Sequence, residues 1–100
     1  MFIIDKLLLP HEMRKRIGQR AKETRLRLNM PQQELASRSG VSLSTVKRFE
    51  QTGNISFGSL LEIAFVLNKM ENFEDIFKAP EITSLFVKEP KTRQRARKTD

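Results

Sequence analysis

The sequence predicts an all-α fold, a compact bundle of about five helices, and three observations favour it. Apolar residues recur at intervals of three and four along most of residues 11–79, which is the spacing of a helix that buries one face. Proline, glycine and asparagine interrupt this pattern at points where helices start or stop. Only residues 81–87, EITSLFV, have a β-forming composition, and they would give one short terminal strand.

The chain of 100 residues has room for one domain with a modest core. Composition divides it into an apolar N-terminal arm (1–10), a helical domain (11–79), an apolar extension (80–87) and a basic tail (88–100). We expect the tail, which lacks large apolar residues, to be disordered on its own. The arm, MFIIDKLLLP, fits either a helical stripe or a short strand. Its apolar side chains need cover from its own domain or from a partner, and we favour its own domain.

The first long helix is expected from about His11 to Leu28. Pro10 suits the first turn of a new helix, where its missing N–H costs nothing, and Asn29 can adopt the left-handed conformation that closes it. One narrow stripe advances by three or four residues and should face the core: Met13, Ile17, Ala21, Thr24 and Leu28.

Two short helices joined by a tight turn follow within residues 32–51. The first, after Pro31, should run from Gln32 to about Ser39 with Leu35 and Ala36 inward. Gly40 can supply the positive φ of the turn, and Ser42 can cap the second helix by accepting a backbone hydrogen bond.

The second of these helices, about Leu43–Gln51, has two faces of different chemistry. Val46 and Phe49 lie on one face and are available for the core. The opposite face carries a complete polar stripe at helical period: Ser44, Lys47, Arg48 and Gln51.

A fourth helix, about Phe57–Asn68 with Ser56 as its cap, is apolar nearly all round. We expect Ile55 and Phe57 to hold the preceding loop against the core. The core stripe of the helix is expected to be Leu60, Leu61, Ala64 and Leu67. The remaining apolar residues need another cover, together with those of a short helix that Asn72 should cap. This expected dimer or partner surface comprises Ile63, Phe65, Val66, Phe73 and Phe77.

The net charge of +7 is unevenly placed along the chain. Residues 11–57 hold ten Lys and Arg against four acids, whereas residues 58–87 hold two against five. A basic first half beside an acidic and apolar second half indicates a polyanion on one surface and a different contact on the other.

The sequence lacks the residues that several functional classes require. The chain has no Cys and one His, no glycine-rich phosphate loop and no expected acid pair in a cleft, so we predict no enzyme, no metal site and no cofactor. His11 is expected to be a surface residue. No apolar run approaches the length of a membrane span, and the opening residues lack the features of a signal peptide. We therefore expect a cytoplasmic protein without membrane contact.

The spacing of Gln32, Leu35–Ala36, Gly40 and Val46, with helices on both sides, resembles the helix-turn-helix of the Xre-type family, which includes Cro and the lambdoid phage repressors. The later run ENFEDIF, a Pro-containing segment and KTRQRARK resemble the HipB-like antitoxins encoded beside HipA-type kinases. The first resemblance implies a lambda-repressor-like fold that binds double-stranded DNA.

The resemblance implies that the second helix of the pair lies in the major groove. Its base-facing residues would be Leu43, Ser44, Lys47 and Arg48. Leu43 departs from the polar residue that many relatives have there, and is either a contact for a thymine methyl group or half-buried. Candidate phosphate contacts are Gln32, Gln33, Arg38, Ser42, Thr45 and Arg25. Arg25 and Glu50 also match the family positions of a partly buried ion pair, and for Arg25 we favour this structural role.

These features lead to two functional hypotheses and a third variant. The first is a sequence-specific DNA-binding repressor that acts as a homodimer, because one helix in one groove gives too few contacts. The second is an interaction module, an antitoxin whose main task is to hold a toxin kinase inactive. The variant is a general nucleic-acid-binding or coactivator protein without a preferred site, which predicts weak and steeply salt-dependent binding.

Overall fold

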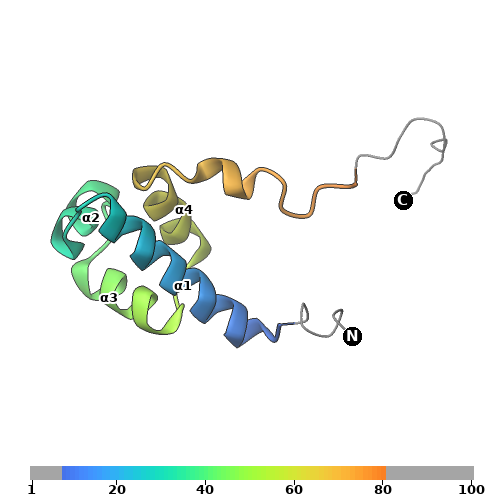
Figure 1. Ribbon diagram of the computed structural model, residues 1–100, viewed down its shortest axis with the longest axis horizontal. Helices are drawn as coiled ribbons and strands as arrows, with labels where there is room; N and C mark the ends of the chain where they lie inside the picture. Colours follow the sequence, from blue (N-terminus) through green and yellow to red (C-terminus); the bar gives the residue numbers. More distant parts are fainter. Residues whose placement is uncertain (1–7, 81–100) are drawn as a thin grey trace.

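The computed structural model describes residues 8–80 as a set of packed helices without a strand in that range, which confirms the predicted all-α fold (Figure 1). The elements in chain order are α1 (Pro10–Arg27), α2 (Gln32–Ser39), α3 (Leu43–Thr52), α4 (Phe57–Val66) and the 3₁₀ helix η2 (Met70–Phe73). Seven residues of the arm, the strand expected at 81–87 and the basic tail lie outside the described residues.

The helix ends follow local rules. Ser42 and Ser56 cap α3 and α4, each accepting a hydrogen bond from the backbone N–H three residues on. Gly40 and Gly53, with φ of 76° and 85°, end α2 and α3 in the left-handed conformation. Asn29, just after the end of α1, has a φ of 54° and closes the helix, as predicted. The start of α1 has an acid in place of a capping hydroxyl, because Glu12 accepts a hydrogen bond from the Leu9 N–H at 2.9 Å.

The core lies where α2, α3 and α4 meet beneath α1. Its largest fully buried side chains come from α2, α3 and α4, namely Leu35, Val46, Phe49 and Ile63. Around them lie the other buried apolar residues, Met30, Ala36, Ala64 and Leu67. Burial of these side chains fixes the helix pair α2–α3 against α1 and α4.

The crossing of α1 and α3 is unusually close. A Cβ atom at Gly18 would collide with the backbone carbonyl oxygen of Phe49. One at Gly53 would collide with the backbone of Arg14. These two glycines therefore allow α1 to touch the end of α3.

The prediction for the buried face of α1 was wrong at both ends of the helix. Met13 and Leu28 are exposed, and the residues of α1 that are fully buried are Gly18 and Arg25. An 18-residue helix is about 27 Å long, whereas the ten residues of α3 span about 15 Å, so the ends of α1 extend past the core.

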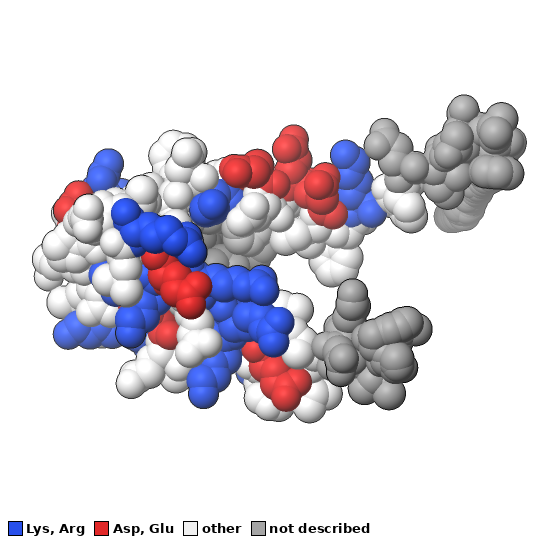
Figure 2. All heavy atoms as spheres, in the orientation of Figure 1, with Lys and Arg blue, Asp and Glu red and all other residues white. Residues whose placement is uncertain are grey.

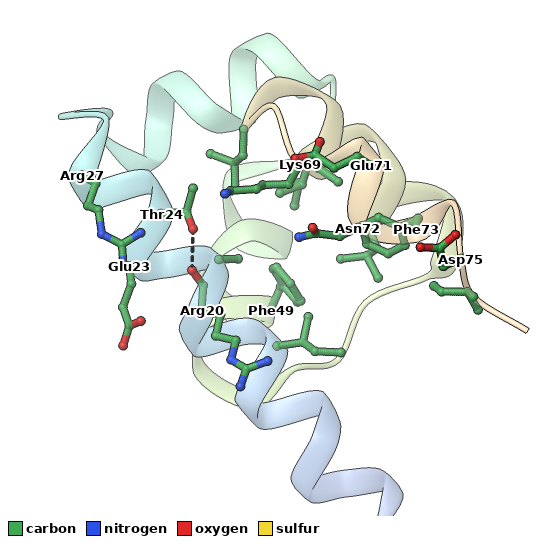
Figure 3. A pocket seen from close by; sticks show the side chains of 17 residues that line it. Arg20, Glu23, Thr24, Arg27, Phe49, Lys69, Glu71, Asn72, Phe73 and Asp75 are labelled. Atoms are coloured by element: carbon green, nitrogen blue, oxygen red, sulfur yellow. Dashed lines mark hydrogen bonds between the residues drawn. The ribbon is translucent and has the colours of Figure 1, made fainter. Parts of the chain in front are cut away.

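The middle of the predicted α1 stripe lines an open groove of about 830 Å³ between α1 and the segment after α4. Ile17, Ala21 and Thr24 are half-buried there. Figure 3 shows Thr24 on one side of this groove and Asn72 on the other, with Phe49 between them. The dashed line in that view is the bond from the Thr24 hydroxyl to the Arg20 carbonyl, 2.9 Å long.

The inward face of α4 differs from the predicted one by a small rotation. Ile63, assigned to the partner surface from the sequence, is 1% exposed and belongs to the core, and Val66 is half-buried against it. Phe57, expected to hold the loop inward, is 62% exposed, although Ile55 does pack on the core. The helix also stops at Val66, and Asn68 has a φ of 63°.

The segment after α4 forms one 3₁₀ turn in place of the predicted helix starting at Asn72. η2 ends at Phe73, and Phe77 has a φ of 63° and is fully exposed. This segment leads away from the helical body in Figure 1. Within residues 8–80, no helix combines the length and apolar character needed to cross a membrane.

Candidate nucleic-acid interface

The turn between α2 and α3 is built from short-range hydrogen bonds. Gly40 donates its N–H to the Ala36 carbonyl at 3.0 Å and turns the chain. The Ser42 Oγ accepts from the Thr45 N–H at 3.1 Å and lies 2.7 Å from the Thr45 hydroxyl. These bonds fix where α3 begins, and so they fix the register of its outward face.

The outward face of α3 is polar and open to solvent. Ser44, Lys47, Arg48 and Gln51 are all exposed. Neither Lys47 nor Arg48 forms an ion pair with an acid among residues 8–80. Leu43, which the resemblance places at a base-facing position, is half-buried against the core. The exposed face thus offers cationic and amide donors without a partner in the described part of the chain.

The inward face of α3 carries the carboxylate of Glu50, which is bonded to side chains of two other helices. The Arg25 Nε donates to the Glu50 Oε2 at 2.6 Å, and its second guanidinium nitrogen donates to Oε1 at 3.0 Å. The pair is bidentate, and the two side chains are only 7% and 3% exposed. The remaining guanidinium nitrogen donates to the Met30 carbonyl at 2.8 Å.

A third side chain joins this network from α2. The Gln32 amide donates to the Glu50 Oε1 at 2.9 Å. One carboxylate therefore holds α1, α2 and α3 in a fixed relation, which sets the direction in which the polar face of α3 points. The Gln32 and Met30 contacts were not anticipated, because both depend on how distant segments pack and leave no local signal in the sequence.

The network bears on the two predicted roles of Arg25. Its side chain is buried and each guanidinium nitrogen donates within the network, which agrees with the structural role that we favoured. A phosphate contact by Arg25 stays a prediction. Gln32 is half-buried and its amide points to Glu50.

The other candidate phosphate residues lie near the ends of the helix pair. Gln33 and Ser42 are exposed and Thr45 is half-buried. Arg38 is exposed and pairs with Glu34 one turn away at 3.1 Å. α2 has Pro31 as its N-cap and no side-chain cap, so its leading N–H groups remain free to bind an anion.

The charges of the described residues are unevenly distributed. Figure 2 shows Lys and Arg over much of the helical body, with some acids among them, and a further group of acids on the segment that follows α4. Those acids are Glu71, Glu74 and Asp75. Among residues 8–80, no cluster of three or more His, Asp or Glu side chains could hold a metal ion. The chemistry offered by the α3 face is therefore recognition of a polyanion by charge and hydrogen bonding.

A fixed pair of short helices joined by a tight turn, with the second helix polar on its outward face, is the arrangement of a helix-turn-helix. Residues 22–70 match the family model described as Helix-turn-helix, of the Xre-like type. The match starts in α1, includes all of α2, α3 and α4, and ends at the first residue of η2. The domain that this family model describes is a regulatory DNA-binding domain. No curated protein matches the chain.

Proposed function

We propose that this protein is a sequence-specific regulator that binds double-stranded DNA as a dimeric repressor and reads the major groove with α3. The observation that carries the proposal is the exposed face of Ser44, Lys47, Arg48 and Gln51 on a helix whose direction is fixed by the Glu50 network. Such a face has the dimensions and donors needed to contact base edges. We also propose that the protein acts in the cytoplasm.

Within this face, Arg48 is the residue proposed to confer the most sequence preference. Its guanidinium is exposed and can donate two parallel hydrogen bonds to the O6 and N7 atoms of guanine. Lys47 and Ser44 would contact neighbouring bases. Leu43, which is half-buried, would present only its exposed edge to a thymine methyl group.

The phosphate contacts are proposed to flank the groove. The free N–H groups at the start of α2, with Gln33, would meet one strand, and Ser42, Thr45 and Arg38 would follow the turn. Such contacts position the protein without reading sequence.

Selection of binding sites from random duplexes, followed by footprinting, tests the proposal. We expect a site with two related halves about one helical turn apart. In Arg48→Ala, preference should relax at one base pair per half-site, at a cost of roughly 1–3 kcal/mol. Lys78→Ala is the matched control, because it removes one exposed cation from the segment after α4.

Two results would count against this assignment. Equal weakening by Arg48→Ala on every duplex would make Arg48 a phosphate contact. Binding by the unaltered protein that is indifferent to sequence would remove sequence-specific regulation altogether.

A second candidate function, an antitoxin that inhibits a toxin kinase, is favoured by the exposed apolar side chains Phe57, Phe65 and Phe77. Such side chains on a surface mark a protein contact. It is compatible with DNA binding, because the complex would be recruited to its own promoter. Co-purification with the product of the adjacent gene is the test, and a protein that purifies alone from cells expressing both genes would argue against it.

A further inference from the structure

The open groove between α1 and the segment after α4 has an apolar floor and partly exposed apolar walls. Its volume is about 830 Å³, and its floor includes the core residues Phe49 and Ile63. On the wall that faces α1, Phe73 is half-buried and Ile76 is 48% exposed. Apolar side chains gathered in this way on an open surface mark a contact site.

The other wall belongs to an apolar row that leads to the start of α1. Leu9, Met13, Ile17 and Ala21 follow one another at intervals of four, so they lie along one side of the helix. We call these four residues the α1 row. Ala21 and Ile17 are half-buried in the groove, whereas Met13 is 41% and Leu9 58% exposed. The row thus loses cover toward the end at which the N-terminal arm attaches. The family match begins at residue 22, so the whole α1 row lies before it.

The length of the arm fits the length of the α1 row. From Leu9 to Ala21 the helix rises about 18 Å, and from Leu9 to Ile17 about 12 Å, at about 1.5 Å per residue. An extended chain covers about 3.3 Å per residue, so the six residues from Leu9 back to Ile3 can span about 20 Å. The same six residues as a helix would span about 9 Å and would stop short of Ile17. Only an extended arm that folds back along α1 reaches the groove.

The charges at the rim of the groove favour an occupant with little net charge. The rim carries three exposed cations and three exposed acids, namely Arg20, Arg27, Lys69, Glu23, Glu71 and Asp75. The arm has one charge of each sign, at Asp5 and Lys6, within an otherwise apolar run. The basic tail has a net charge of +4, from six Lys and Arg and two acids, and lacks large apolar residues. The arm therefore matches this groove better than the tail does.

The groove also offers polar groups to an extended backbone. Thr24 and Asn72 lie on its opposite sides (Figure 3). An asparagine amide can both donate to and accept from a backbone, which is what an extended segment needs where it leaves water. In Figure 1 the N-terminal end of α1 and the segment after α4 point to the same side of the molecule. The groove between them therefore opens toward the point where the arm attaches.

We propose that residues 2–7 of this chain fold back along the α1 row as an extended segment, with Ile3 and Ile4 in the groove beside Ala21. The docked arm covers the exposed part of the α1 row, and Asn72 bonds its backbone. Because Phe49 belongs to α3, the arm also supports the proposed recognition helix from the side opposite its polar face.

Disulfide cross-linking within one chain tests the position of the arm. The chain contains no cysteine, so two introduced cysteines are its only thiols. On mild oxidation, Ile3→Cys/Ala21→Cys should give a linked monomer, because a disulfide needs the two Cα atoms within about 7 Å. Ile3→Cys/Gln19→Cys is the matched control, since Gln19 is exposed and faces the other side of α1. The Ala21 variant should close at least about tenfold faster than this control.

The other candidate occupants of the groove give different products. Equal rates for the two variants would mean that the arm has no preferred position on α1, and would overturn the proposal. A linked dimer in place of a linked monomer would show that the arm of a second copy fills the groove. Fast closure of Leu85→Cys/Ala21→Cys, without closure of the arm variant, would assign the groove to the apolar extension. Either of these results also overturns the proposal.

Thermal melting of the full chain without introduced cysteines is an independent measurement. Ile3→Asp places a charge in the apolar groove and should lower the melting temperature by about 4–8 °C. Phe77→Asp is the matched control and should leave it unchanged, because Phe77 is fully exposed and does not line the groove. An Ile3→Asp protein that melts with the unaltered protein would refute the docking. Neither experiment involves DNA, so the proposed function is judged separately.

Discussion

α3 and α4 are built alike and face different surroundings. Each has ten residues and a serine N-cap, with cap distances of 3.1 Å and 3.2 Å. Both bury apolar side chains on one face. On the other, α3 exposes Ser44, Lys47, Arg48 and Gln51, whereas α4 exposes Phe57 and Phe65. The comparison shows that the same local rules place both helices in this small domain, while the outward residues give the two surfaces different chemistry.

The two helices also differ in how they are anchored. α3 is held by the buried Arg25–Glu50 pair, by Gln32 and by the close crossing at Gly18. α4 is held by apolar packing, chiefly through Ile63, and takes part in none of the ion pairs formed within residues 8–80. The expected effects of substitution follow from this difference.

The largest effect is expected at the buried carboxylate. Glu50→Ala leaves the Arg25 guanidinium charged and buried without its partner, which should lower the free energy of unfolding by roughly 3–5 kcal/mol. Denaturant titration measures the loss. Glu34→Ala is the control, since it breaks an exposed pair on α2 that should contribute no more than about 0.5 kcal/mol. Similar losses for the two variants would mean that the network does not anchor α3.

Alanine substitutions at two glycines should change the free energy of unfolding in opposite directions. Gly18→Ala places a methyl group against the backbone of Phe49, which should cost about 1–3 kcal/mol. Gly58→Ala on α4 meets no neighbour, and the better helix propensity of alanine should stabilise the protein by up to about 1 kcal/mol. Thermal melting decides the matter. A Gly18→Ala protein as stable as the original would show that α1 and α3 can move apart without cost.

The smallest effects are expected at the two serine caps, and they distinguish the roles of Ser42 and Ser56. Ser42→Ala and Ser56→Ala should each lower the free energy of unfolding by about 1 kcal/mol, because each removes a cap bond to a backbone N–H. Ser42→Ala also removes the contact with the Thr45 hydroxyl. Only Ser42→Ala should also weaken DNA binding, since Ser42 lies at the start of the proposed recognition helix. The measurement is titration with duplex at a temperature where both variants are fully folded. Equal weakening by both would assign Ser42 a structural role alone.

Much of the fold could be predicted because its helix ends obey local rules. Gly40 and Ser42 mark the turn from sequence alone, since positive φ and capping depend on residue type. The faces of α4 could not be assigned in this way. A helix that is apolar nearly all round fits several orientations, and only packing against α2 and α3 shows that Ile63 points inward and Phe57 outward.

The candidate site likewise has a part that could be predicted from the sequence and a part that could not. The polar stripe of α3 is visible in the sequence, because it follows the helical period, and its DNA contacts stay a prediction. The partners of Glu50 come from positions 25 and 32, and no spacing rule connects residues so far apart. The Arg25 partner was predicted through the family resemblance rather than through a pattern. Arg25 also shows why exposed and buried arginines cannot be told apart by composition.

The shared carboxylate of Glu50 has a consequence for how the molecule opens. Because Arg25 of α1 and Gln32 of α2 both bind Glu50 of α3, a fluctuation that frees α3 must break its bonds to both other helices at once. Their backbone amides should therefore exchange with deuterium as one cooperative unit, while those of η2, which has no buried residue, exchange more readily. The proposed recognition helix would then keep its orientation through the partial openings that release the segment after α4.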